Sequence, residues 1–104
     1  MIYVIATIEL ESGRRDEFLA EFRQLVPKVL EEQGALEYAP TIDIPTEIPS
    51  QPPVRDNVVT VMEKWEDTDA LAAHLMAPHM VEYRNMIKEK EMVVGMSLQV
   101  LQPA

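Results

Sequence analysis

The chain has 104 residues, of which 9 are Lys or Arg and 18 are Asp or Glu, so its formal net charge at pH 7 is −9. This length suits a single domain over residues 1–104, and the negative charge argues against nucleic acid as a partner, since that role requires neutralising phosphates. The absence of cysteine excludes disulfides, thiolate metal sites and a cysteine nucleophile, and a hydrophobic content of 47% excludes a disordered acidic tail.

The first ten residues are apolar but too short to span a bilayer. They also lack the basic start and the small-residue cleavage site of a signal peptide. We therefore expect a cytoplasmic protein with no membrane partner.

The first part of the chain predicts two strands around one helix. Residues 2–10 carry apolar side chains at every even position, which is the period of a strand. Residues 14–33 repeat apolar side chains at helical spacing, and Gly34 is a natural helix end. Residues 35–44 form a second predicted strand, in which Pro40 indicates a sheet edge, a bulge or a local break.

The second part predicts two further strands and a broken helix. A proline-rich loop at 45–56 is long for a hairpin connection, which makes it a candidate lid. The valine-rich residues 57–66 predict a strand, and a short helix capped by Asp67 or Thr68 follows as far as Met76. Pro78 suits the first turn of another helix that runs to about residue 91, and residues 93–101 alternate as a fourth strand.

This order, β-α-β-β-α-β, indicates a ferredoxin-like α+β fold, an antiparallel sheet with its helices on one face. The other face would hold Tyr3, Ile5, Val58 or Val59, and part of the fourth strand, which is too apolar a surface to face water. We expect two copies to stack these faces, so that a homodimer forms a barrel.

The two histidines, His74 and His79, are five residues apart with Pro78 between them. This spacing does not place them reliably on one helix face, so no metal site is expected. His74 ends the short helix, where it is either a general base that faces a cavity or a terminal histidine held by a carbonyl or carboxylate.

Glu63 and Trp65 lie two residues apart on the third predicted strand and therefore share a face. A carboxylate beside an indole among valines is costly unless it is paired or functional. Glu63 is thus either a tuned acid in a pocket wall or the partner of an Arg or Lys. Glu31 and Glu32, by contrast, are expected to lie on a solvated helix face, which implies no binding partner for the protein.

Methionines are concentrated in the last third of the chain. They either fill the core or line a cavity that would accept a flat apolar ligand. They are Met76, Met80, Met86, Met92 and Met96.

The segment from Glu63 to His79 resembles the central motif of the antibiotic biosynthesis monooxygenase domain family. It contains Glu63-Lys64-Trp65-Glu66-Asp67, Ala70-Leu71, Ala73-His74-Leu75 and Pro78-His79. The resemblance extends over almost the whole chain through Val4-Ile5-Ala6, Ser12-Gly13, Glu17-Phe18 and Gly34-Ala35-Leu36-Glu37-Tyr38. It implies a dimeric α+β barrel of two ferredoxin-like protomers, each with a small-molecule cavity between helices and sheet.

Several members of this family are oxygenases that need no metal, flavin or haem, because a deprotonated hydroquinone can itself pass an electron to dioxygen. The resemblance therefore implies a monooxygenase without a cofactor, acting on a small aromatic or quinol-type substrate. It implies catalytic roles for Glu63 and for His74 as the proton acceptor. We expect four residues to bind the substrate. Trp65 would form an aromatic wall and Tyr38 would donate a hydrogen bond to the phenol, and His79 and Met76 would also contact the substrate.

Two departures from the family pattern matter. The haem-degrading branch has an asparagine and a haem-ligating histidine where this chain has Ala6 and Arg84, so haem chemistry is not expected. The loop at 45–56 is longer than the usual hairpin of the family.

The alternative function is a non-catalytic dimeric module that binds a small ligand. His74 and Glu63 pointing inward beside Trp65 would favour the enzyme, whereas a methionine-filled cavity with His74 in solvent would favour the module.

Overall fold

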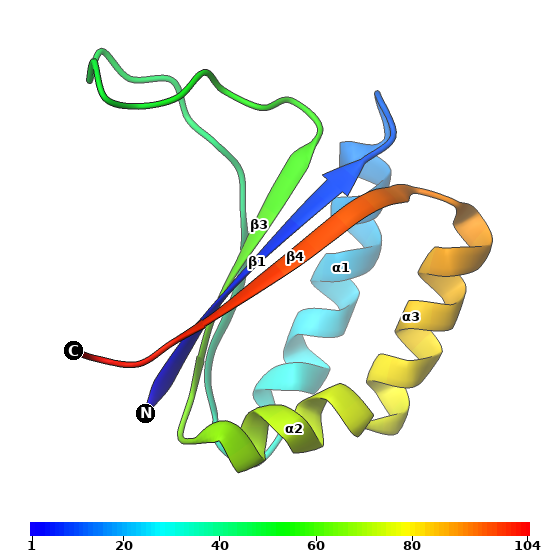
Figure 1. The fold of residues 1–104 in the computed structure, drawn as a ribbon. Coiled ribbons are helices and arrows are strands. Elements are labelled where there is room, and N and C mark those ends of the chain that lie inside the picture. The colour runs from blue at the N-terminus through cyan, green and yellow to red at the C-terminus, as the bar shows by residue number, and fades with distance from the viewer.

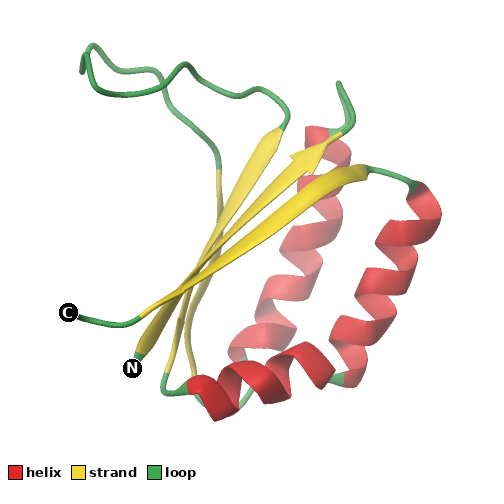
Figure 2. Ribbon diagram, viewed as in Figure 1, coloured by secondary structure: helices red, strands yellow, loops and turns green.

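The computed structural model describes residues 1–104, in which four strands and three helices form two layers (Figure 1). In chain order they are β1 (Ile2–Leu10), α1 (Arg15–Leu30), β2 (Ala35–Thr41), β3 (Val58–Trp65), α2 (Thr68–Met76), α3 (Pro78–Lys90) and β4 (Val93–Leu101). The strands make one antiparallel sheet in the order β2-β3-β1-β4, and all helices lie on one side of it (Figure 2). The predicted ferredoxin-like α+β fold is confirmed. None of the helices has the length and apolar character needed to cross a membrane.

The core lies between the sheet and α1. Every even residue of β1 is buried, and the register that pairs Ala6 with Val61 puts the odd residues of β3 on the same side. Helix α1 supplies the opposing apolar stripe at helical spacing. The residues that these three elements contribute to the hydrophobic core are Ile2, Val4, Ala6, Ile8, Leu10, Phe18, Leu19, Phe22, Leu25, Val29, Val59, Val61 and Trp65.

Strand β2 is shorter than predicted, because it ends at Thr41 and not at residue 44. Ile42 and Ile44 belong to the long loop between β2 and β3, where both are exposed. Arg55 closes the base of this loop by donating to both carboxylate oxygens of Asp43, from Nε at 2.9 Å and Nη2 at 3.0 Å. The loop extends away from the helices (Figure 1).

Strand β4 lies at the other sheet edge, beside β1 alone. Its register with β1 places Met96, Leu98 and Val100 on the side that carries the helices. These side chains are nevertheless 45–61% exposed, because no helix packs closely over β4. Of the apolar residues expected on the opposite face, Tyr3, Ile5 and Val58 do lie there, whereas Val59 is buried in the core. The fourth strand contributes Leu101, which pairs with Tyr3.

The break between α2 and α3 brings three helix ends together. Of the two predicted capping residues, Asp67 and Thr68, it is the Asp67 carboxylate that caps α2, by accepting from the Ala70 N–H at 2.8 Å. Ala77 is extended, and Pro78 begins α3. As a result, His74 near the end of α2 and His79 in the first turn of α3 both lie within hydrogen-bonding distance of Glu32, just beyond the end of α1.

Candidate functional site

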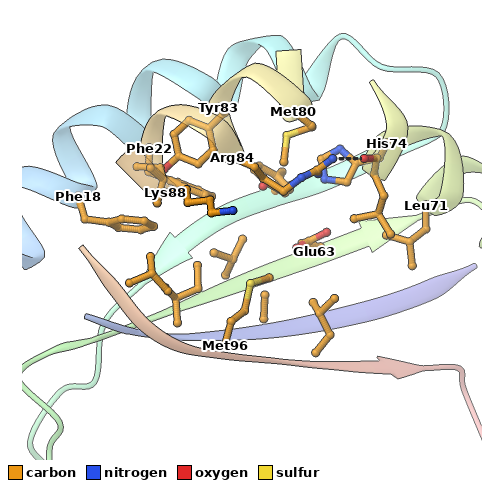
Figure 3. Close-up of a pocket in the computed structure, with 18 of the residues that line it drawn as sticks. Phe18, Phe22, Glu63, Leu71, His74, Met80, Tyr83, Arg84, Lys88 and Met96 are labelled. Atoms are coloured by element: carbon orange, nitrogen blue, oxygen red, sulfur yellow. Dashed lines mark hydrogen bonds between the residues drawn. The ribbon is translucent and has the colours of Figure 1, made fainter. Parts of the chain in front are cut away.

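A cavity of about 600 Å³ lies between the sheet and the helices, a volume within the range of small-molecule sites (Figure 3). Its lining is mostly apolar, with 14 hydrophobic residues of 20. The sheet contributes Ala6, Ile8, Val61, Val93, Met96 and Leu98, and the helices contribute Phe18, Phe22, Leu71, Leu75, Met80, Tyr83 and Ile87. The uncovered side of β4 forms part of this lining, so the space that α3 leaves over the sheet is the cavity itself.

His74 lines this cavity and is only 2% exposed. Its Nδ1 lies 3.0 Å from each carboxylate oxygen of Glu32, and no protein group bonds to its Nε2. The ring is held on its sides by Trp65, with centroids 4.6 Å apart, and by Tyr38 at 5.4 Å. Burial lowers the pKa of His74, an effect that the bond to Glu32 opposes, so a neutral imidazole faces the cavity.

Glu63 comes from β3 and points into the cavity beneath the helices (Figure 3). One of its carboxylate oxygens accepts the Trp65 indole N–H at 3.0 Å, and no cation pairs with it. Burial raises the pKa of Glu63 to about 7, although the indole bond favours the charged form. This carboxyl can therefore hold or release a proton near neutral pH.

Tyr38 and Tyr83 bring phenol groups to the same cavity. Burial, and secondarily the charge of Glu63, raises the pKa of Tyr38 well above its usual range, so its hydroxyl stays protonated. Burial likewise raises the pKa of Tyr83, whose hydroxyl is buried without a hydrogen-bond partner. Phe22 packs against both rings, with centroids 5.4 Å from Tyr38 and 6.0 Å from Tyr83.

Two cations of α3 line the cavity in a chain whose net charge is −9. The side chains of Arg84 and Lys88 extend into the space between α3 and the sheet (Figure 3). Arg84 donates from Nη2 to the Leu75 carbonyl at 2.6 Å, which holds its guanidinium near the end of α2. Glu11 and Glu91 also line the cavity, so its walls carry both signs of charge.

The structure separates the six residues expected at the site into two groups. His74, Glu63 and Tyr38 line the cavity. Trp65 is completely buried behind them, where it bonds Glu63 and contacts His74 without reaching the cavity wall. His79 lies outside the cavity and bonds Glu32, and Met76 is 78% exposed and also outside.

Glu32 is the residue at this site that the sequence does not reveal. It does not lie on the solvated face that was expected, because its carboxylate is mostly buried and contacts His74 and His79. The contact spans 42 residues of sequence, so no local spacing could indicate it. No group of three His, Cys, Asp or Glu residues in the structure is arranged to hold a metal ion.

Comparison with known proteins identifies the family. The family model described as "Antibiotic biosynthesis monooxygenase" matches residues 1–86. The chain belongs to the antibiotic biosynthesis monooxygenase family. Among its relatives, "Probable quinol monooxygenase YgiN" of Escherichia coli is 37% identical to this chain over 105 residues. The match covers 99% of this chain and 98% of that protein.

Solved structures show that the fold of this family member recurs at low sequence identity. A conserved protein from Methanosarcina mazei superposes with a TM-score of 0.79 at 20% identity, over 99% of this chain and 92% of that one. PA3566 from Pseudomonas aeruginosa gives a TM-score of 0.78 at 21% identity, over 99% and 93% of the two chains. Similarity at this level establishes the architecture alone.

Proposed function

We propose that this family member is a monooxygenase that oxidises a small aromatic substrate of quinol type with dioxygen, using no cofactor. The observation that carries the proposal is the buried, neutral His74, whose unbonded Nε2 belongs to a ring that lines an apolar cavity. The similarity to a protein named as a quinol monooxygenase over nearly the whole chain supports the same substrate class.

The proposed reaction needs no external reductant. His74 Nε2 takes the proton of one substrate hydroxyl, and the resulting anion, which lies near the Arg84 cation, gives electrons to dioxygen. One oxygen atom enters the ring and the other leaves as water, so a hydroquinone becomes a hydroxyquinone and supplies every electron. The apolar walls exclude water from the charged intermediates.

Two further cavity residues have proposed roles in this scheme. The Tyr38 hydroxyl, which stays protonated, donates a hydrogen bond to a substrate oxygen. The Glu63 carboxyl, with a pKa of about 7, exchanges a proton with the second hydroxyl as the quinone forms. Trp65 acts on the substrate only through Glu63 and His74, because it does not reach the cavity.

The test is oxygen consumption with a panel of hydroquinones and naphthols in metal-free buffer. His74→Ala is expected to lower kcat by about 10²-fold to 10⁴-fold, the usual contribution of a general base. Asp69→Ala, an exposed position on the same helix, is the matched control and should retain wild-type turnover. Because His74 is buried, circular dichroism must first show that the variant is folded.

The same experiment separates the enzyme from a ligand-binding module. His74 and Glu63 both line the cavity, which favours the enzyme. A quinol that quenches Trp65 fluorescence without any oxygen uptake would instead support the module. Neither uptake nor binding across the panel would contradict the quinol proposal.

We also propose that the protein acts as a homodimer, in which the two sheets stack through the faces that carry no helices. On this face Tyr3, Met62 and Leu101 are 37–43% exposed. An apolar surface on the central strands of a sheet is typical of an interface. A second copy of the same face is its proposed occupant.

A further inference from the structure

We propose that Glu32 is the positioning residue that fixes the tautomer and orientation of His74, so that the Nε2 lone pair faces the cavity. The inference rests on the proposed function, because it assigns the residue that prepares the proposed base. Neither the family motif nor the sequence pattern points to this carboxylate.

The hydrogen-bond geometry determines where the protons lie. Both oxygens of Glu32 are 3.0 Å from His74 Nδ1, and Oε2 is 2.6 Å from His79 Nε2. An ionised carboxylate can only accept, so each contacting imidazole nitrogen must carry the hydrogen. A neutral His74 with its proton on Nδ1 leaves Nε2 as an acceptor, which is the form that a proton-accepting base requires.

The carboxylate is itself held in one place. Glu32 lies in the turn after α1, where its N–H donates to the Val29 carbonyl and its own carbonyl accepts the Ala35 N–H at 3.2 Å. Its side chain is 12% exposed, and a second contact, from His79, restrains it. Rotation about its side-chain bonds would therefore break two charge-assisted contacts at once.

Glu32 also balances the charge that forms when His74 accepts a proton. Besides Glu32, the titratable groups near His74 are Tyr38 from β2, Glu63 from β3, and His79 and Arg84 from α3. Electrostatic repulsion from His79 and Arg84 disfavours a cationic His74 and lowers its pKa. Glu32 is the acidic side chain in contact with its ring, so it compensates the imidazolium at a site where a lone buried cation would be costly.

The experiment reads the His74 tautomer directly by nitrogen-15 NMR of the imidazole rings in protein without substrate. In the wild type we expect neutral His74 to carry its proton on Nδ1. In Glu32→Ala that preference should be lost and signals of the Nε2-protonated form should appear. Glu31→Gln changes an exposed neighbour and is the matched control, in which the wild-type tautomer persists.

Glu32→Gln separates orientation from charge. The amide oxygen still accepts from Nδ1–H, so the tautomer should persist, but the negative charge is lost. Because the interaction with Glu32 raises the pKa of His74, the acidic limb of the kcat profile should move to lower pH. With a quinol substrate, kcat should fall at least about 10-fold, more in Glu32→Ala than in Glu32→Gln, while KM changes little.

The two proposals fail in different ways. A wild-type-like tautomer in Glu32→Ala, or equal effects in Glu31→Gln, would overturn the role of Glu32 even if quinols are oxidised. The expected tautomer change together with no quinol oxidation in the wild type would instead remove the proposed function.

Discussion

Glu63 is 7% exposed on the cavity wall, and its only hydrogen bond comes from the Trp65 indole. Burial raises its pKa from the usual 4.5 to about 7, so ionising this carboxyl opposes folding. Below pH 4.5 the group is protonated in both the folded and the unfolded chain. Between pH 4.5 and about 7 the unfolded chain releases its proton first, so the free energy of unfolding falls as pH rises.

Glu63→Gln removes this titration while keeping an oxygen that can accept the Trp65 N–H. We expect the variant and the wild type to be close in stability at pH 4, and the variant to be more stable at pH 8. The difference at pH 8 should be at most about 3 kcal/mol, since a tenfold change in proton affinity corresponds to about 1.4 kcal/mol. Urea unfolding at both pH values measures it, and a difference that does not change with pH would contradict the burial argument.

Individual site residues were predictable where a local pattern carried the information. The period of two along β3 correctly places Glu63 and Trp65 on one face, and the helix break places His74 near a helix end. The role of Glu32 could not be predicted, because two adjacent glutamates at a helix end are ordinary on a solvated surface. Its contacts arise only when the ends of three helices meet.

At the scale of elements, the turn from α1 into β2 depends on Gly34. This residue has a φ of +84°, and a Cβ built on it would lie 2.6 Å from the Ala70 Cβ of α2. The turn therefore needs glycine both for its backbone conformation and for the close approach of α2.

Gly34→Ala should lower the free energy of unfolding by about 2 to 4 kcal/mol, from backbone strain together with overpacking against α2. Gly13→Ala is the matched comparison, because Gly13 has a similar φ of +80° but no heavy atom within 4 Å of its added Cβ. That variant should cost only about 1 kcal/mol. Equal losses in urea unfolding of the two variants would show that contact with α2 contributes nothing.

Most elements follow from hydrophobic period and capping residues, which explains why β1, α2 and β4 have the predicted bounds. The end of β2 does not follow, because Ile42 and Ile44 continue a strand-like alternation after the chain has left the sheet. The solvent exposure of the side of β4 that faces the helices could not be predicted from the sequence either. It depends on how far α3 stands from the sheet, which is a tertiary property.

At the scale of the whole molecule, the sheet face without helices predicts the state of assembly. Met62 lies at its centre, paired with Ile5 on β1 and Ala39 on β2, and is 39% exposed. Light scattering should give a mass twice that of the 11.9 kDa chain, and Met62→Lys should shift it toward the monomer. Met76→Lys alters a more exposed methionine on α2 and should leave the mass unchanged. A monomeric wild type would exclude the sheet-to-sheet dimer.

The uncovered side of β4 also determines which methionines are most open to oxidation. Met80 and Met96 line the cavity, whereas the more exposed Met76 lies outside it. Thioethers are readily converted to sulfoxides, which are polar and larger. If dioxygen reacts in this cavity, methionine sulfoxide will form at Met80 and Met96 before it forms at the more solvent-exposed Met76. The working lifetime of the protein would then be limited by the same apolar lining that admits an aromatic ring.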